Sequence, residues 1–522
     1  MCLTKITRRD SSASGSLSSV DSNLSVHKNK YNRGSTNKFT TQPKFLIVGA
    51  GAAGLACAVS LLKTGFKYVT VVEAENRIGG RIFTKSFGDN VVDLGAQWCH
   101  GEKKNIVYES VFDKIILGSS SYIYTKFDCI RSDGEILPNN VVDKLKGLLA
   151  QIFARRHTDL PTFAGTFGEY LSKNFYEILM SKEYNEIDFT IAREFFENFL
   201  KIERSETAAG LEEISAQGFE SYKDCDGDYL LHFENGFGQY LQVLLEADEI
   251  GNDLGLLEDK ILFGLNVKEI KWDRADFRVE VTCENSPVIF LVDHVIVTVP
   301  LGVLKRDAKK MFEPQLPVSK QNAIEGLGFG CMMKLFFEFS PPFWNNKWTG
   351  VAMLWREEDI SAIRKSTRAW VEDIYGFYRV PNQPNVLVGF MVGSKIPFVE
   401  VMSDAEVIEG CMYLLRRFLP HWHIPTPIEF IKSIWVTNPN FCGTSSFRSL
   451  KTEELETGAE ILAQPITLLA QASTIEISLT VKPVVLFAGE ATHEHYFGTV
   501  HGAVESGIRE AKRLESYYTL DI

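Results

Sequence analysis

Residues 44–74 read KFLIVGAGAAGLACAVSLLKTGFKYVTVVEA, and this stretch decides the fold of the 522-residue chain. Two apolar runs, 45–48 and 68–72, suit buried parallel strands. Between them, residues 49–54 (GAGAAG) have the G-x-G-x-x-G spacing. The first glycine permits a tight turn, the second allows backbone amides to approach a pyrophosphate, and the third lets a helix pack closely on the strand. The stretch therefore predicts a strand–turn–helix–strand unit that binds a dinucleotide.

The surroundings of the glycine turn favour this prediction over a turn without a ligand. Glu73 ends the second strand, where a carboxylate can accept hydrogen bonds from ribose hydroxyls. The pyrophosphate is expected at the helix N-terminus, where unpaired N–H groups and the helix dipole favour negative charge. Residues 45–62 carry no charge and are long enough to resemble a membrane span. Their glycines at fixed offsets, and the strand that follows, favour a buried strand–helix unit instead.

The composition is that of an ordinary globular protein, with 45% hydrophobic and 23% charged residues. The net charge is −12, but residues 1–43 hold seven Lys/Arg and two acidic residues, which leaves −17 for the rest of the chain. An acidic body disfavours nucleic acid as a partner, because phosphates require positive charge. It suits a cationic substrate, although solubility alone also explains it.

The cysteines and the two ends of the chain bear on the cellular compartment. Nine cysteines are scattered without a C-x-x-C pair, which favours reduced thiols, an intracellular protein and no metal site. The Ser-rich, basic segment 1–43 is predicted to be disordered, and it lacks the apolar core of a secretion signal. Residues 519–522 (TLDI) lack a Ser-Lys-Leu address. We expect a cytoplasmic protein, with the nucleus as a further compartment and mitochondrial import through 1–43 as the weaker alternative.

Four further motifs follow the dinucleotide unit. Residues 73–81 read EAENRIGGR, and residues 94–98 read LGAQW. GEAT stands at 489–492 and HGA at 501–503. These motifs occur in the order found in the flavin-containing amine oxidases, which the chain resembles from about residue 44 to residue 515. Within that family the resemblance is closest to the animal spermine and N1-acetylpolyamine oxidases.

The resemblance implies an α/β fold, with a Rossmann-like FAD-binding domain of the amine-oxidase (GR2) type and an interleaved α+β substrate-binding domain. The FAD-binding domain is expected to take three separate segments, 44–115, 228–305 and 431–522. The substrate-binding domain is expected to take 116–227, which we predict to be helical, and 306–430.

The residues predicted to bind FAD, non-covalently, come from the glycine turn, the motifs above, one adenine-contacting strand and a tryptophan beside the isoalloxazine. They are Gly49, Gly51, Ala53, Gly54, Glu73, Arg81, Gly95, Gln97, Trp98, Val267, Trp435, Gly489, Glu490, Thr499 and Val500. For Arg81 the alternative is a surface arginine. The residues themselves support its role, because two glycines and a guanidinium close behind the turn suit a second wall around the same diphosphate.

Two residues are predicted to take part in the chemistry. Lys334 interrupts an apolar strand, where burying a lysine is costly, so it is either an edge lysine that extends to solvent or a functional one. The resemblance favours the functional role, because animal polyamine oxidases have a lysine in this context that holds a water against flavin N5. It also implies that His100 contacts the substrate nitrogen, the alternative being a histidine satisfied by its neighbours.

The reaction implied by the resemblance is hydride transfer from the carbon beside a secondary amine to flavin N5. The imine hydrolyses to an aldehyde and a shorter amine, and O2 reoxidises the flavin to give H2O2. The expected partners are a polyamine and O2, with no nucleic acid and no membrane, and the oligomeric state stays open. The alternatives are a histone-lysine demethylase-like enzyme, a desaturase on the same fold, or a flavin-binding scaffold without activity.

Two features bear on the substrate. Ser445 stands where several polyamine oxidases have Tyr or Phe beside the flavin, so an aromatic clamp on the substrate is at least half missing. An acidic cluster precedes residue 214, and it is either a set of solvated helix faces or the source of one substrate-binding carboxylate. Its members are Glu203, Glu206, Glu212 and Glu213.

Overall fold

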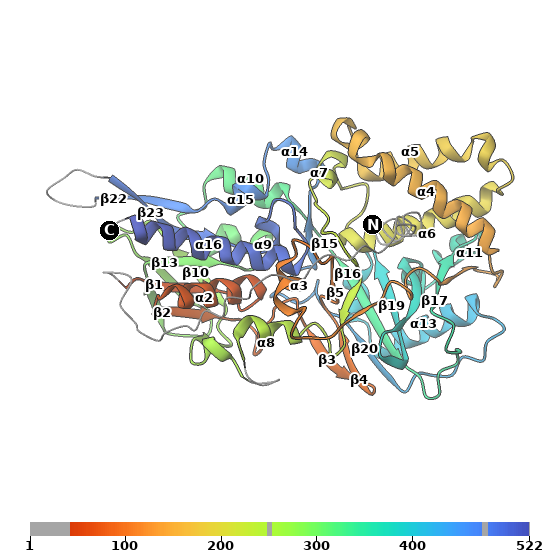
Figure 1. Cartoon of the computed structure of the whole chain (residues 1–522), viewed down its shortest axis with the longest axis horizontal. Helices are drawn as coiled ribbons and strands as arrows, with labels where there is room; N and C mark the ends of the chain where they lie inside the picture. The colour runs from red at the N-terminus through yellow and green to blue at the C-terminus, as the bar shows by residue number, and fades with distance from the viewer. Residues whose placement is uncertain (1–41, 248–252, 472–478, 521–522) are drawn as a thin grey trace, which may run out of the picture.

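The computed structural model describes residues 42–247, 253–471 and 479–520 (Figure 1). The predicted disorder of 1–43 lies outside the described residues except for its last two positions, as do the last two residues of the C-terminal TLDI. Figure 1 shows two lobes side by side, one around a mostly parallel sheet on the left and one around a mostly antiparallel sheet on the right. Red, green and blue elements lie together in the left lobe, so stretches far apart in the sequence build it.

The left lobe is organised around a six-stranded sheet. Its strands, in spatial order, are β22 (Ile466–Gln471), β23 (Leu479–Phe487), β13 (His294–Val297), β1 (Lys44–Val48), β2 (Tyr68–Val72) and β9 (Ile261–Leu262). All neighbours are parallel except β22 and β23. The short apolar runs at the start of the chain thus form the central strands, as buried parallel strands should. The prediction of a strand–turn–helix–strand unit at 44–74 is confirmed.

Two long helices pack on each other against this sheet. α2 (Ala52–Thr64) follows the glycine turn, and α16 (Val500–Leu520) closes the chain. Their backbones approach closely because glycines stand at the contact: a Cβ at Gly507 would lie 2.1 Å from the Ala53 carbonyl oxygen. Among the described residues, no helix is long and apolar enough to cross a bilayer, and the uncharged run 45–62 divides into β1 and α2.

The right lobe contains the second six-stranded sheet. Its strands, in spatial order, are β20 (Glu429–Lys432), β16 (Met332–Glu338), β19 (Gln383–Val392), β18 (Ile374–Val380), β17 (Gly350–Leu354) and β7 (Asp128–Arg131). Phe336 packs with α4 (Asn139–Asp159), α5 (Phe167–Leu179) and α6 (Phe189–Thr207). Leu335 and Phe337 point to the opposite face and join the cluster that contains α13 (Asp404–Phe418). The period-two alternation of strand side chains therefore places helices on both faces.

Smaller elements complete the two lobes. The strands are β3 (Thr84–Phe87), β4 (Asn90–Asp93), β5 (Trp98–Cys99), β6 (Leu117–Ser119), β8 (Leu231–Phe233), β10 (Val267–Lys271), β11 (Val279–Cys283), β12 (Ile289–Val292), β14 (Phe312–Glu313), β15 (Gly328–Gly330) and β21 (Ser445–Phe447). The helices are α3 (Ile106–Val111), α7 (Ala216–Glu220), α8 (Gln239–Leu245), α9 (Leu301–Met311), α10 (Val318–Gly326), α11 (Glu357–Ile363), α12 (Ile396–Val401), α14 (Leu450–Glu454) and α15 (Ala459–Ala463).

The structure differs from the predicted helical character of one segment, and it suggests a new limit for another. The segment 116–227 is not purely helical, because β7 lies within it and pairs with β17 in the second sheet. The limit after residue 305 falls inside α9, whose apolar residues pack with α10 and with strands of the parallel sheet. We therefore propose that the second stretch of the cofactor domain extends to about residue 327, the last residue of that cluster before β15.

Candidate functional site

A cavity of about 330 Å³ is lined by residues of both lobes and gathers nearly all of the predicted site residues. Those that line it are Gly49, Gly51, Ala53, Glu73, Arg81, Gly95, Gln97, Trp98, His100, Val267, Lys334, Trp435, Gly489, Glu490, Thr499 and Val500. Gly54 is not among them. A Cβ there would lie 2.0 Å from the Gly49 carbonyl oxygen, so Gly54 serves the close packing of α2 on β1.

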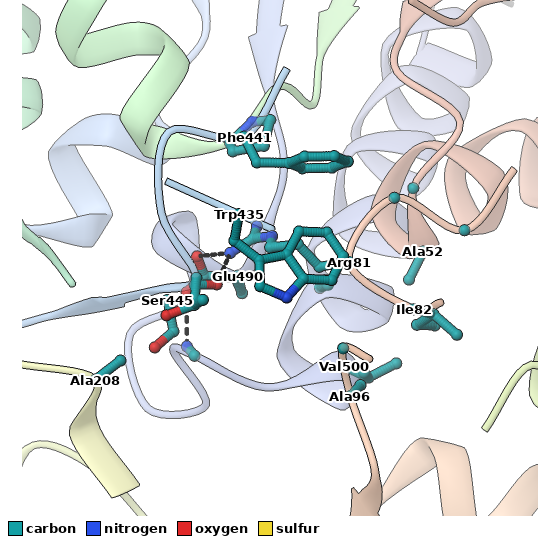
Figure 2. A pocket seen from close by; sticks show the side chains of 18 of the residues that line it. Ala52, Arg81, Ile82, Ala96, Ala208, Trp435, Phe441, Ser445, Glu490 and Val500 are labelled. Carbon is teal, nitrogen blue, oxygen red and sulfur yellow. Dashed lines mark hydrogen bonds and ion pairs between the residues drawn. The ribbon is translucent and has the colours of Figure 1, made fainter. Parts of the chain in front are cut away.

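Two glycine turns face each other at the end of the cavity that belongs to the left lobe of Figure 1, which is called the left end below. In Figure 2 this end, with Ala52 and Ile82, lies on the right. Gly51 forms a bridge with Gly79, whose N–H donates to the Ala50 carbonyl at 2.8 Å. The nearest atom to an ideal Cβ at Gly51 is the Gly80 Cα at 3.9 Å, so space remains beside the turn. Within the described residues no side chain caps the N-terminus of α2. Open N–H groups at a helix N-terminus and room beside them suit a diphosphate.

Glu73 lies next to this turn. Its carboxylate accepts hydrogen bonds from the Ala50 N–H at 2.7 Å and the Glu75 N–H at 2.8 Å. Burial raises the pKa of Glu73, and the two N–H groups partly offset that rise. The carboxylate is thus held at the end of β2, beside Val267, where it can accept further hydrogen bonds from ribose hydroxyls.

The partly exposed Arg81 and the buried Glu490 form an ion pair in another part of the wall (Figure 2). The Arg81 guanidinium lies 2.9 Å from Glu490 Oε1 and donates to the Thr444 carbonyl at 2.7 Å. Glu490 Oε2 accepts from Ser446 Oγ and from the Gly498 N–H, both at 2.6 Å. Burial by itself would raise the pKa of Glu490, but Arg81 and these hydrogen bonds lower it overall. The pair joins the wall segments that contain Arg81, residues 444–446, Glu490 and Gly498. Whether Arg81 also contacts a diphosphate stays a prediction.

Lys334 is buried, only 2% exposed, and its Nζ is surrounded by oxygens. It donates to the Asp93 carbonyl at 3.0 Å, the Gly95 carbonyl at 2.8 Å and Gln97 Oε1 at 2.7 Å. Burial lowers the pKa of Lys334, and the nearby Asp93 carboxylate partly counters this. An ammonium group has three N–H donors, and these three acceptors use all of them. A water bound to Nζ therefore requires the neutral amine, whose lone pair accepts a hydrogen bond, or the release of one acceptor.

Trp435 joins Lys334 in holding the same backbone segment. Its Nε1 donates to the Leu94 carbonyl at 3.1 Å, between the two carbonyls that Lys334 binds. Figure 2 shows the indole in the middle of the wall, with the Phe441 ring above it. Gly95 is required at this point, because a Cβ would lie 1.8 Å from the Arg81 carbonyl oxygen and 3.2 Å from the Trp435 ring.

His100 and Trp98 lie on the side toward the right lobe. His100 Nδ1 contacts the Tyr229 carbonyl at 2.8 Å, and its ring stacks on the Tyr229 ring at 4.2 Å. Trp98 Nε1 is buried and, among the described residues, has no hydrogen-bond partner. Because buried donors are normally paired, a bound molecule with an acceptor atom fits this part of the cavity.

The right end of the cavity is lined by aromatic side chains that the sequence analysis missed. They are Tyr124, Phe127, Tyr375, Tyr378 and Phe390, and Met332 lies among the lining residues with them. Tyr375 and Phe390 come from neighbouring strands and stack at 5.8 Å. The alternation of side chains in residues 374–392 predicts strands, but it does not tell which face of a strand borders a cavity.

The structure separates the four acidic residues near the end of α6. Glu206 lines the cavity together with Ser205 and Ala208. Glu203 is fully buried, and Glu212 and Glu213 are exposed. Ser445 also lines the cavity, and Figure 2 shows it beside Ala208 on the side away from Ala52 and Ile82. Other lining residues that the sequence did not indicate are Thr298, Arg306, Asn440 and Phe441.

Comparison with known proteins agrees with this site. A family model described as flavin containing amine oxidoreductase matches residues 52–514. The human peroxisomal N(1)-acetyl-spermine/spermidine oxidase is 29% identical, and the match covers 93% of this chain and 97% of that protein. Polyamine oxidase 1 of Oryza sativa subsp. japonica is 27% identical over 91% of this chain and 98% of that protein.

A solved structure of wild-type putrescine oxidase bound to putrescine superposes with a TM-score of 0.64. It covers 91% of this chain and 99% of that one at 18% sequence identity, which is a likeness of fold. The predicted α/β fold of the amine-oxidase type is confirmed. With a dinucleotide turn, a buried cavity between two sheets and a family model that spans both lobes, the chain belongs to the flavin-containing amine oxidoreductase family, whose cofactor is a flavin.

Proposed function

We propose that this protein is a polyamine oxidase that binds FAD non-covalently and oxidises a secondary amine of spermine or of an N1-acetylated polyamine. The observation that carries the proposal is the composition of this cavity. One end has the glycine turns and Glu73, which suit a dinucleotide, and the other end has aromatic walls and the carboxylate of Glu206. An aromatic chamber with one carboxylate suits an alkyl chain that carries a positive charge.

Three features of the cavity wall support FAD as the cofactor. The space beside Gly51, the carboxylate of Glu73 and the unpaired Trp98 Nε1 each match a part of a flavin dinucleotide. Non-covalent binding is supported by the lining of the cavity, which among the described residues includes no cysteine that could attach to a flavin.

The chain's own residues have distinct tasks in the proposed reaction. Bound FAD supplies the hydride acceptor, which O2 reoxidises with formation of H2O2. The aromatic walls align the alkyl chain and exclude water, and Glu206 binds an ammonium group away from the reacting carbon. The reacting nitrogen must be neutral, so the buried chamber also favours the free base of the amine by desolvating its charged form. We propose His100 as the contact of this nitrogen and Lys334 as the anchor of the 93–97 wall.

The test is anaerobic mixing of the purified protein with spermine, N1-acetylspermine, spermidine and a simple monoamine. We expect rapid bleaching of the flavin by one polyamine, slow bleaching by the monoamine, and H2O2 after air is admitted. A protein that binds FAD but is bleached by none of the polyamines refutes the proposal. Bleaching by a methylated lysine peptide would then indicate a demethylase-like enzyme, and bleaching by a long apolar substrate would indicate a desaturase. Bleaching by no substrate would indicate a scaffold.

The cellular location is a separate proposal. We propose a cytoplasmic enzyme, although the human and bovine relatives carry the word peroxisomal in their names. Imaging of the full chain with a peroxisomal marker tests this. Small-molecule amine and O2 are the proposed partners.

A further inference from the structure

Trp435 forms part of the cavity wall although it lies in an irregular segment. It follows β20 and belongs to no strand or helix, yet it is only 4% exposed. Its ring meets Phe441 edge-on at 4.9 Å, and its Nε1 binds the Leu94 carbonyl. A wall residue on such a segment needs something else to fix its backbone, because no sheet ladder holds it.

One carboxylate accepts from the N–H groups of this segment, while the Trp435 carbonyl accepts from the Gly443 N–H at 3.0 Å. Three successive N–H groups donate to Glu400: Trp435 and Val436 to Oε1 at 2.7 and 2.9 Å, and Thr437 to Oε2 at 2.6 Å. Glu400 is 5% exposed; its hydrogen bond with Trp435 is buried, and those with Val436 and Thr437 are partly buried. Hydrogen bonds to a carboxylate are stronger than neutral ones, and without Glu400 three N–H groups, that of Trp435 being buried, would lose their acceptor.

Glu400 is itself on a fixed element. It stands on α12, and Lys432 of β20 donates to the Val399 carbonyl at 3.3 Å and to the Met402 carbonyl at the C-terminal end of that helix. The last carbonyls of a helix have no partner within it, so a lysine there joins the helix to the sheet. The carboxylate that holds residues 435–437 is thus tied to the strand from which these residues emerge.

We propose that Glu400 is the positioning residue that holds the Trp435 indole in the cofactor cavity, acting through the N–H groups of residues 435–437. The inference rests on the proposed function only for the identity of the bound group, FAD. Glu400 itself does not line the cavity. Its loss leaves the Trp435 backbone with the Gly443 contact alone, and we expect the indole then to shift from the Leu94 carbonyl and the space beside Gly95.

The first test uses the wild-type full chain and needs no variant. Amide hydrogen exchange is measured by mass spectrometry before and after FAD is added. We expect the peptide that contains 435–437 to be protected already without FAD. Exchange of this peptide at the rate of an unprotected chain, in protein that is otherwise folded, overturns the proposal.

The second test compares Glu400→Gln with Glu454→Gln, a change at an exposed carboxylate on α14. A glutamine presents one NH2 group to N–H donors, so it cannot accept all three hydrogen bonds. We expect Glu400→Gln to raise the Kd for FAD about ten-fold or more, a loss of about 1.4 kcal/mol or more. The near-UV circular dichroism of the FAD-free protein should change as well. Glu454→Gln should leave both unchanged, and Glu400→Asp, which keeps the charge on a shorter side chain, should fall between.

A double-mutant cycle with Trp435→Ala separates positioning from general stability. If Glu400 acts through the indole, Glu400→Gln should cost little FAD affinity once the indole is absent. An equal cost in both backgrounds, or an unchanged Kd for FAD in Glu400→Gln, overturns the proposal. Failure of every polyamine to bleach the flavin would refute the proposed substrate alone, because FAD affinity and hydrogen exchange do not depend on it.

Discussion

Lys334 and Lys320 are two buried lysines in similar surroundings but at different places. Lys320, on α10, donates to the carbonyls of Ile461, Leu462 and Gln464 and lies 4.2 Å from the centre of the Phe487 ring. Lys334 donates to three oxygens of the cavity wall. A comparison of the two lysines therefore separates two effects of losing a buried lysine: the loss of hydrogen bonds to carbonyl oxygens, and the loss of a function beside the flavin.

Replacing each lysine with methionine uses this comparison. Both variants leave carbonyl oxygens unpaired, so both should lower the free energy of unfolding. Only Lys334→Met should lower the rate constant of flavin reduction by the amine, by about ten-fold or more, because the 93–97 wall loses its anchor. Stopped-flow absorbance under anaerobic conditions measures this rate. Equal rate constants of flavin reduction in the two variants would show that Lys334 has no special role in the reaction.

Lys320 also predicts a dependence of stability on pH. Burial lowers its pKa from 10.5 to about 7, with further effects of Glu510, Arg509 and Arg513. Between these two values the unfolded chain binds a proton at this residue that the folded chain does not, so the free energy of unfolding should rise with pH. Urea unfolding of the wild type and Lys320→Met across this range gives the contribution of Lys320 as a difference in slope. Parallel curves would contradict it.

Glu206 is predicted to recognise the charge of the substrate. Glu206→Gln keeps the shape of the side chain but removes its charge, so KM for a polyamine should rise about ten-fold, which corresponds to about 1.4 kcal/mol. KM for a simple monoamine should not change, because it has no second ammonium group. Glu212→Gln, at an exposed carboxylate six residues further along, is the control. A similar rise of KM for both amines would show a general disturbance of the cavity.

At the scale of elements, glycines decide how closely helices approach their neighbours. Gly54→Ala places a Cβ 2.0 Å from the Gly49 carbonyl oxygen and should lower the free energy of unfolding by about 1–3 kcal/mol. Gly147→Ala is the control, because no atom of the described residues lies within 4 Å of an ideal Cβ at this position of α4. It should stabilise the protein by about 0.5–1 kcal/mol. Thermal unfolding of the FAD-free proteins measures both, and a neutral Gly54→Ala would contradict the close packing.

The elements also show how far the sequence could predict the fold. The strand–turn–helix–strand unit was predictable because its apolar runs and glycine offsets act locally. β7 was missed because four residues, 128–131, in a mostly helical segment carry little signal of their own. We propose a limit later than 305 because α9 follows β13 and its packing partners lie elsewhere in the sequence, which the sequence alone does not show.

The site divides in the same way. Predicted residues such as Glu73 and Glu490 belong to motifs, and they line the cavity. Tyr375, Tyr378 and Phe390 belong to strands whose pattern predicts burial but not the surface they border. Glu203 and Glu206 lie three residues apart on α6, and the sequence does not tell which of the two carboxylates borders the cavity. Glu400 had no local signal, because its three partners lie 35–37 residues away.

At the scale of the whole molecule, one cavity connects two lobes. FAD at about 100 times its Kd should add about 2.7 kcal/mol to the stability of the protein. Trp344, Trp348 and Trp422 lie together in the right lobe, so tryptophan fluorescence reports on its unfolding. We expect FAD to raise the midpoint seen by fluorescence as well as the midpoint seen by far-UV circular dichroism. ADP-ribose, which lacks the isoalloxazine, should raise the fluorescence midpoint less. If FAD leaves the fluorescence midpoint unchanged, FAD binding in the cavity does not stabilise the right lobe, which would contradict coupling between the lobes.

The order of strands in the parallel sheet also bears on how the protein is made. β1 leaves the ribosome early, but its neighbour β13 begins at residue 294, and β23, which completes the row, ends at residue 487. Synthesis of the whole chain takes on the order of a minute. The first central strand therefore waits through most of translation with one edge unpaired. We therefore expect the nascent chain to expose an unpaired strand edge, and the complete cofactor cavity to form only after its last lining residues, which extend to Ala503, have emerged.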